Sequence, residues 1–199
     1  DRRQRQMCIR DRNRIKLNIM GVKGSRKKNN SPTKYQEPDL LVGVDDILKS
    51  AQEKGLYTGK SLNIEDVVNS FEDIQVVYES MDANQSGSLS NIDGKWIVCI
   101  NKNHNNKRQR FTLAHELGHY ILHKEKSVEF VDTTFFRSDE MDSIEYHANE
   151  FAARLLMPEN TVRNLIEEER IKNIGVLAEQ FGVSSAAMKY SCLLYTSPS

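Results

Sequence analysis

The chain has 199 residues, of which 38% are hydrophobic and 28% are charged, and its formal net charge at pH 7 is zero. This size and composition suit one soluble domain with tails. They exclude a membrane-spanning protein, because no stretch approaches the roughly 20 apolar residues that a bilayer requires. The basic first residues are not followed by an apolar run, so we expect no signal peptide and a cytoplasmic location.

Both ends of the chain resemble translated sequencing adapters. DNA that encodes Met7–Asp11 has a reverse complement that, in a shifted frame, encodes Cys192–Thr196. The requirements of folding offer no reason for such a relation between two chain ends. We therefore expect that residues 1–12 and 192–199 are not native and that the gene is truncated at both ends.

The rest of the chain is mildly acidic and holds a single cysteine. Residues 1–12 carry a net charge of +3 and residues 192–199 carry none, so the remaining residues have a net charge of −3. This charge gives no support to unaided binding of nucleic acid. Cys99 alone provides no disulfide framework, which fits a reducing compartment.

The first half of the remaining chain predicts an arm followed by two helices. Residues 13–38 are polar and rich in Lys and Asn, which indicates a linker or a disordered arm. Apolar residues recur at a helical period from Leu40 to Lys54. Asn63 is suited to cap a second helix from Ile64 to about Phe71, which has two acidic residues in its first turn.

Three short segments, 74–78, 86–90 and 96–100, predict strands, and the third is the clearest because it is the most apolar. Residues 91–94 supply turn chemistry between the second and third strands. We therefore expect a small antiparallel sheet.

The rest of the chain predicts helices, which makes the expected fold class α+β. They cover 107 to about 123, 140–157 and 159 to about 170, with Pro158 ending the second. Residues 174–191 predict a helix, a turn at Gly182 and another helix. The small sheet is expected to pack on the helix at 107–123 and on further helices.

The helix at 107–123 carries a pattern typical of catalytic zinc sites. His115 and His119 are four residues apart, so they lie about 6 Å apart along the axis on one face and can hold the same ion. Glu116 lies beside them, where it can reach a water on the metal. The spacing predicts a zinc site with Glu116 as the general base.

A catalytic zinc ion needs a third protein ligand and an open fourth position. His123 lies about 12 Å beyond His115 along a straight helix, too far to share the ion, so we expect it to orient a neighbour. Glu145, on the next helix, is the favoured ligand, with Glu140 and Glu150 as rivals. Asn149, one turn after Glu145, is expected to bond one of the two histidines.

Two segments resemble those of the ImmA/IrrE family of metallo-endopeptidases. Arg110–His123, with the sequence RFTLAHELGHYILH, resembles the active-site helix of that family, and Glu145–Pro158 resembles its second signature. The resemblance covers roughly residues 63–190. It implies a zincin-like, gluzincin-type domain that binds one Zn²⁺ through His115, His119 and Glu145, with Glu116 catalytic.

The resemblance also implies a biological role and a division of the chain. Members of the family cut a DNA-binding repressor, so we expect a protein substrate, specifically a helix-turn-helix repressor, in phage, mobile-element or stress regulation. Residues 39–170 would form the metallopeptidase domain. Residues 171–191 would be a truncated helix-turn-helix-like segment, for which a plain helical hairpin packed on the peptidase is the alternative.

Two other functions remain open, as do the contacts with substrate. The chain could be a non-catalytic zincin scaffold that binds a repressor or antitoxin, or a regulator that contacts DNA through residues 174–190. For a peptidase, we expect strand 96–101 to align the substrate as an added strand. The three candidates for stabilising the oxyanion are Asn101, His104 and Tyr120.

Overall fold

The structure is a computed structural model that describes residues 40–133 and 139–196. The expected N-terminal adapter segment and the polar arm at 13–38 lie outside the described residues. All described residues belong to one compact unit. Its elements are α2 (Leu40–Glu53), α3 (Ile64–Asn69), β1 (Ile74–Glu79), β2 (Gln85–Ile92), β3 (Lys95–Asn101), α4 (Asn106–His123), β4 (Glu129–Thr133), α5 (Asp139–Leu156), α6 (Glu159–Glu167), α7 (Ile174–Phe181) and α8 (Ser185–Thr196).

The sheet has four strands in the order β1-β3-β2-β4. β2 runs antiparallel to both β3 and β4, whereas β1 runs parallel to β3, with Ile74 opposite Trp96. The predicted α+β class is confirmed, but the expectation of a wholly antiparallel sheet is wrong for the β1–β3 pair. The reason is that β2 does not fold back on β1. Instead β3 inserts between them, which makes β1 and β3 parallel.

The hairpin between β2 and β3 forms as the sequence predicts. Asp93 and Gly94 have φ values of 52° and 85°, the conformation that a two-residue type I′ turn requires. This turn sets the register in which Leu89 faces Val98. Both side chains are fully buried and form part of the core between the sheet and α4.

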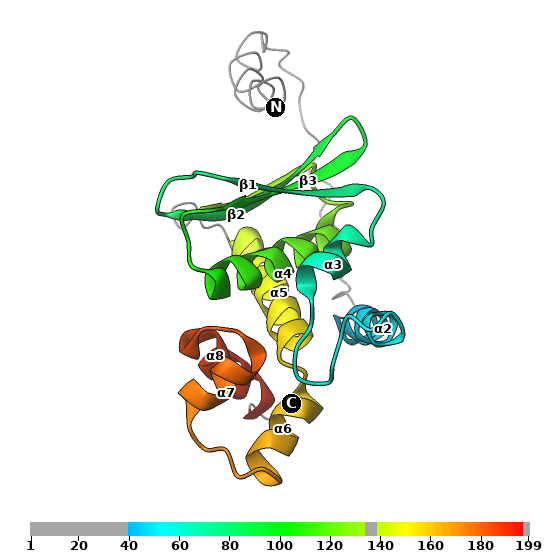
Figure 1. The fold of residues 1–199 in the computed structure, drawn as a ribbon. Helices are drawn as coiled ribbons and strands as arrows, with labels where there is room; N and C mark the ends of the chain where they lie inside the picture. Colours follow the sequence, from blue (N-terminus) through cyan, green and yellow to red (C-terminus); the bar gives the residue numbers. More distant parts are fainter. Residues whose placement is uncertain (1–39, 134–138, 197–199) are drawn as a thin grey trace, which may run out of the picture. The chain divides into compact units, whose positions relative to one another are not determined.

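The sheet lies over α4, and α5 packs against α4 on the side away from the sheet (Figure 1). Gly118 explains how closely the two helices approach. A Cβ atom at this position would lie 3.1 Å from the Phe151 ring and 3.2 Å from the Ala148 backbone. Because Gly118 and Ala148 are small, α5 comes within side-chain reach of the histidines on α4.

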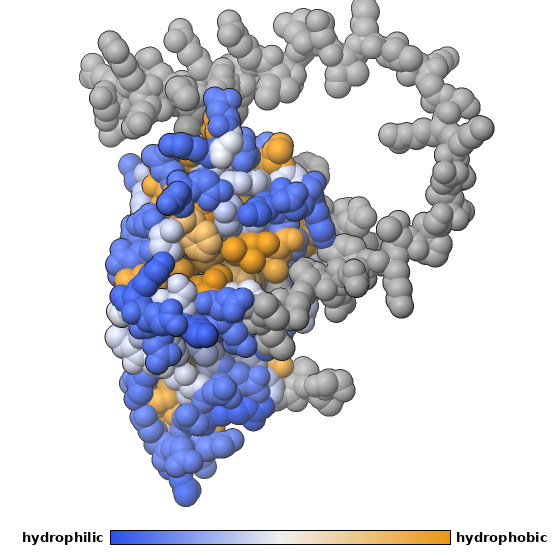
Figure 2. Space-filling view, turned by 90° about the vertical axis from the view of Figure 1, so that its right-hand side faces the viewer, coloured by the Kyte–Doolittle hydropathy of each residue, from blue (hydrophilic) through white to orange (hydrophobic). Residues whose placement is uncertain are grey.

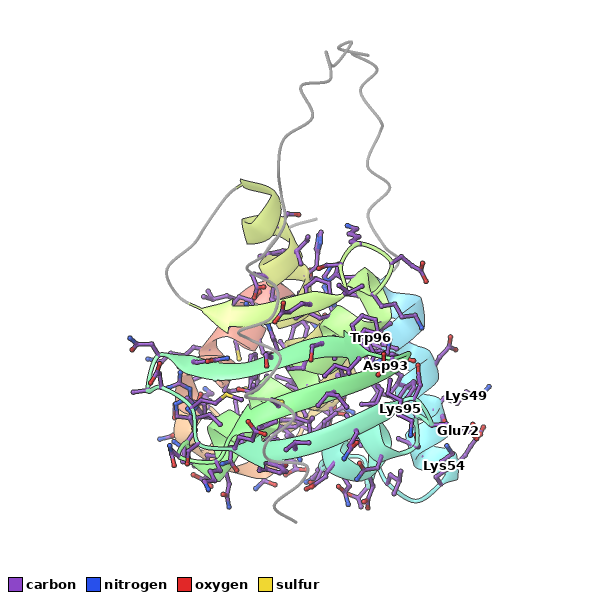
Figure 3. All side chains as sticks on the ribbon, turned by 90° about the horizontal axis from the view of Figure 1, so that it is seen from above. Lys49, Lys54, Glu72, Asp93, Lys95 and Trp96 are labelled. Atoms are coloured by element: carbon purple, nitrogen blue, oxygen red, sulfur yellow. The ribbon has the colours of Figure 1, made fainter. Side chains whose placement is uncertain are left out.

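An aromatic contact attaches the second half of α4 to the beginning of strand β3. Figure 3 looks down on the sheet and labels Trp96 at the start of β3, beside the exposed Lys95. The Trp96 ring meets the Tyr120 ring edge-on at 5.9 Å. This contact holds the second half of α4 against the sheet.

The last three helices follow α5, and α8 packs against α5 and α7. Gly182, with φ 63°, ends α7 in the left-handed conformation, and α8 begins three residues later. Met188 and Ser191 of α8 are buried, and the Tyr195 hydroxyl donates to the carbonyl of Met157 at the end of α5. The predicted helix, turn and helix are therefore present, and the second helix continues to Thr196.

The described surface gives no sign of a membrane segment. In the part of the chain that the structure describes, no helix combines the length and apolar character that a bilayer crossing needs. The side that carries α2 shows mostly hydrophilic residues with a smaller hydrophobic area (Figure 2).

Candidate metal centre

His115 and His119 project from successive turns of α4 toward one point. Their Nε2 atoms lie 3.0 Å apart, and the two rings meet edge-on with centroids 4.6 Å apart. Both side chains are buried, with 4% and 1% of their surface exposed. The helical spacing therefore brings two imidazole nitrogens together in a site largely shielded from water.

Glu145 completes a cluster of three possible ligands. Its two carboxylate oxygens lie 3.2 Å from the Nε2 atom of His115 and 3.3 Å from that of His119. The ligand atoms of all three residues lie within 4.8 Å of one another, the single such group among the described residues. Of the rival ligands, Glu150 is paired with Arg154, and the side chain of Glu140 lies outside the description.

The carboxylate of Glu145 is held in its charged form. Burial alone would raise its pKa, but the hydrogen bonds from His115 and His119 and their nearby charge outweigh burial. The pKa of Glu145 therefore lies below its ordinary value. A charged carboxylate with two imidazole nitrogens is a donor set suited to a divalent cation such as zinc.

The Nδ1 atoms of the two histidines have partners of their own. His115 Nδ1 lies 3.2 Å from the side-chain oxygen of Asn149, and His119 Nδ1 lies 3.2 Å from Nδ1 of His123. An oxygen acceptor at Asn149 requires a proton on His115 Nδ1, so in the neutral ring the Nε2 lone pair is left for a metal in place of the hydrogen bond to Glu145. The structure thus brings both residues that were expected to orient a ligand to the cluster.

His123 is suited to accept a hydrogen bond from the Nδ1 atom of His119. Burial, followed by the charges of His119, Lys126 and His147, lowers the pKa of His123 to about 3 against the opposing effect of Glu145. The ring is therefore neutral and can accept at Nδ1. On the other side, Phe130 of β4 stacks on the His119 ring with centroids 4.7 Å apart, which further restricts the ring.

Glu116 is buried against β2, and Gly87 makes room for it. A Cβ atom at residue 87 would lie 2.9 Å from the Glu116 carboxylate, 2.6 Å from the Thr112 methyl group and 3.0 Å from the Cys99 carbonyl oxygen. Any residue larger than glycine would displace at least one of these groups. Neither this contact nor the Phe130 stack was found from the sequence, although a glycine inside a strand is a known signal of close approach.

The three candidates for stabilising the oxyanion each make contacts within the fold, and their role toward a substrate stays a prediction. Asn101 is fully buried, and its side-chain amide bonds the backbone of Met81 and Asp82, in the loop between β1 and β2, and of Gln85 at the start of β2. His104 Nε2 lies 3.3 Å from the carbonyl oxygen of Ala83 in the same loop.

Tyr120 turns toward the sheet, where its hydroxyl donates to both oxygens of Asp73 at 2.9 and 3.0 Å. The expectation that β3 adds a substrate strand is wrong, because β3 is already paired on both edges, with β1 and with β2.

Residues 71–193, more than half of the chain, match the Peptidase_M78 family, described as the IrrE N-terminal-like domain. Over 98 residues, the chain is 31% identical to the radiation response metalloprotease IrrE of Deinococcus radiodurans, a match that covers 48% of this chain and 30% of that protein. It is 41% identical over 66 residues to the uncharacterized immunity region protein 2 of Bacillus phage phi105, covering 33% of this chain and 39% of that protein.

Both matches therefore span well under half of the length of these curated relatives. Among solved structures, a Mycobacterium tuberculosis transcriptional regulator shares the fold with a TM-score of 0.52 at 18% identity, over 73% of this chain and 44% of that one. The predicted resemblance to the ImmA/IrrE family and the zincin-like α+β fold are thereby confirmed. The chain belongs to the Peptidase_M78 family of IrrE N-terminal-like domains.

Proposed function

We propose that the chain is a zinc-dependent endopeptidase in which His115, His119 and Glu145 hold one Zn²⁺ and Glu116 is the general base. The observation that carries this proposal is the convergence of three ligand atoms within 4.8 Å, supplied by two different helices. Two imidazoles and one carboxylate form a ligand set of catalytic zinc sites, which keep a fourth position open for water or substrate.

Each residue of the proposed site has its own role in peptide hydrolysis. A bound zinc ion would supply Lewis acidity at the scissile carbonyl. Glu116, whose side chain extends from α4 toward Gly87 of β2, would take a proton from the attacking water and pass it to the leaving amine. Asn149 and His123 would keep both histidines in the tautomer that presents Nε2.

The substrate that we propose is a protein, namely a helix-turn-helix repressor. This part of the proposal rests on membership of the family and on the resemblance to ImmA/IrrE proteins, whose members cut repressors. The similarity to a phage immunity-region protein and to a radiation response metalloprotease supports a role in phage or stress regulation.

Replacing Glu116 with Gln tests the assignment of the base. We expect purified protein to contain one zinc ion per chain and Glu116→Gln to retain it, because residue 116 is not among the proposed ligands. Cleavage of the repressor encoded beside the gene should fall by a factor of about 100 or more. Glu150→Gln is the matched control, since Glu150 pairs with Arg154 outside the cluster and should leave cleavage intact.

Two results would count against the proposal. Unimpaired cleavage by Glu116→Gln would remove the assigned base. A wild-type protein that binds zinc and the repressor but never cuts it would favour the scaffold that binds a repressor or antitoxin without hydrolysis.

A further inference from the structure

A pocket of about 450 Å³ opens beside the metal cluster, between the first turns of α4 and the α7–α8 pair. We call it the α4–α8 pocket. Its lining comprises Asn105, Lys107, Arg108, Phe111, Asn149, Ser184, Ala187 and Tyr190. None of the proposed zinc ligands is part of this lining.

The pocket continues the face of α4 that bears the metal ligands. Arg108, Phe111 and His115 follow one another at intervals of three and four residues, so they share one side of the helix. Asn149 lines the pocket and also bonds the Nδ1 atom of His115 at 3.2 Å. A polypeptide bound across the metal cluster could therefore place a neighbouring side chain in the pocket.

The charge at the pocket is positive and only partly compensated. Lys107 forms an ion pair with Glu179 of α7. The guanidinium of Arg108 donates to the Ser86 hydroxyl at 2.8 and 3.2 Å, which is a neutral partner, and it has no carboxylate partner among the described residues.

α4 also begins here. Its first turn contains no acidic residue, so the positive end of the helix dipole adds to the charge of Arg108.

The other walls are apolar. Phe111, Ala187 and the ring of Tyr190 come from α4 and α8 and provide surface for a hydrocarbon chain. An apolar wall beside an uncompensated cation suits a side chain that has a methylene stem and ends in a carboxylate.

We propose that the α4–α8 pocket binds an acidic side chain of the protein substrate, near the bond to be cut. The carboxylate would lie at Arg108, and the stem would pack on Phe111 and Tyr190. This inference rests on the proposed peptidase function. A nucleic-acid phosphate would meet the same cation, but the net charge of −3 outside the adapter-like ends disfavours a polyanion, whereas a single acidic side chain needs no extended basic surface.

Peptide binding tests the proposal without requiring cleavage. Zinc-loaded Glu116→Gln protein would be immobilised and exposed to an equimolar library of degenerate dodecapeptides, and the retained peptides would be sequenced. We expect Glu and Asp to be enriched about fivefold at one position, the size of effect that one solvent-accessible ion pair produces.

Variants in the same background connect this preference to the pocket. Arg108→Gln should abolish the acidic enrichment, and Arg108→Glu should replace it with enrichment of Lys. Ala187→Trp, which fills the pocket, should weaken retention of all peptides. Lys102→Gln is the matched control, because it removes an exposed cation from the loop before α4 that does not line the pocket.

The outcomes separate this inference from the proposed function. Acidic enrichment that depends on Arg108 supports the pocket even if wild-type protein cuts nothing. Absence of peptide retention, absence of acidic enrichment, or enrichment that survives Arg108→Gln would overturn the proposal. So would binding of a fluorescein-labelled DNA oligonucleotide that depends on Arg108 and displaces the acidic peptides, because a phosphate would then be the occupant.

Discussion

Gly87 shows how one side-chain hydrogen can decide the position of the carboxylate that we propose as the general base. The backbone of β2 passes so close to α4 that a methyl group at residue 87 would have its carbon 2.9 Å from Glu116 and 3.0 Å from the Cys99 carbonyl oxygen. The Cys99 carbonyl is held in the sheet and cannot move far, and the Thr112 methyl group, the nearest neighbour at 2.6 Å, lies on the same helix as Glu116. The part of α4 that carries Thr112 and Glu116 would therefore be displaced, and the Glu116 carboxylate with it.

We predict that Gly87→Ala lowers peptide cleavage at least tenfold while zinc content stays at one ion per chain. Overpacking of this kind should also reduce the free energy of unfolding by about 1–3 kcal/mol. Gly43→Ala is the control, because a Cβ atom there would make only ordinary contacts, 3.6 Å from Ile121 and 3.9 Å from Phe151. Cleavage would be measured with a peptide substrate, and the free energy of unfolding would be measured in urea. Unchanged cleavage by Gly87→Ala would show that Glu116 tolerates the extra carbon.

Two variants of Asn149 distinguish the effect of its hydrogen-bond acceptor from the effect of its packing. Asn149→Ala removes the oxygen that faces His115 Nδ1, and we predict a 10- to 100-fold loss of zinc affinity, the usual effect of losing such a partner. Asn149→Asp keeps an acceptor oxygen and should retain most of the affinity. Competition with a chromophoric chelator would measure both values, and equal losses in the two variants would refute the role of the acceptor.

The local parts of the site were predictable from sequence, and the parts made by tertiary contact were not. His115, Glu116 and His119 are connected by one helical turn, so their relation follows from helix geometry. Asn149 was predictable because it follows Glu145 by one turn. The approach of Gly87 to Glu116 depends on where β2 meets α4, and no local pattern encodes that position.

Among the elements, α4 is the one that all parts of the site depend on, and Tyr120 fastens it to the sheet. Its hydroxyl bonds Asp73 just before β1, and its ring contacts Phe71 and Trp96. Burial, followed by the hydrogen bond to Asp73 and its charge, raises the pKa of Tyr120 to about 12. The folded state thus favours the protonated phenol.

We predict that Tyr120→Phe reduces the free energy of unfolding by about 1–3 kcal/mol, because it removes a hydrogen bond to a carboxylate, and leaves cleavage within a few-fold of wild type. The contribution of the phenol to stability is complete below pH 10 and is lost as the pH rises toward 12. Chemical denaturation at pH 8 and 11 should therefore show that the difference between Tyr120→Phe and wild type shrinks at the higher pH. A large loss of cleavage would instead support the prediction that Tyr120 contacts the substrate.

The same distinction between local and distant contacts holds for the elements. Helices and the β2–β3 hairpin were predictable because periodicity and the Asp93–Gly94 turn are local signals. The parallel pairing of β1 with β3 was missed, because sequence alone does not say that a third strand inserts between two neighbours. β4 was missed because Glu129–Thr133 is short and charged, and its partner β2 lies far away in the chain.

At the scale of the whole molecule, the cluster of His115, His119 and Glu145 joins α4 to α5. α4 contacts the sheet, and α5 contacts α4 and α8, so the contact of Glu145 with the histidines adds to the packing between α4 and α5 at the centre of the described unit. A ligand that binds only the folded state stabilises it in proportion to its affinity and concentration. Zinc should therefore raise the unfolding temperature of the entire unit rather than of the site alone.

We predict that zinc at 100 times its dissociation constant raises the melting temperature of EDTA-treated protein by about 5–10 °C in one cooperative transition. Glu145→Gln should lose most of this increase, because an uncharged amide replaces the carboxylate that faces both histidines. Glu150→Gln removes the same charge five residues farther along α5, where Glu150 pairs with Arg154, and should keep the full increase. Differential scanning calorimetry with and without zinc would measure all three proteins. A full zinc-dependent increase in Glu145→Gln would mean that another residue completes the ligand set and that α5 is not joined to α4 through the metal.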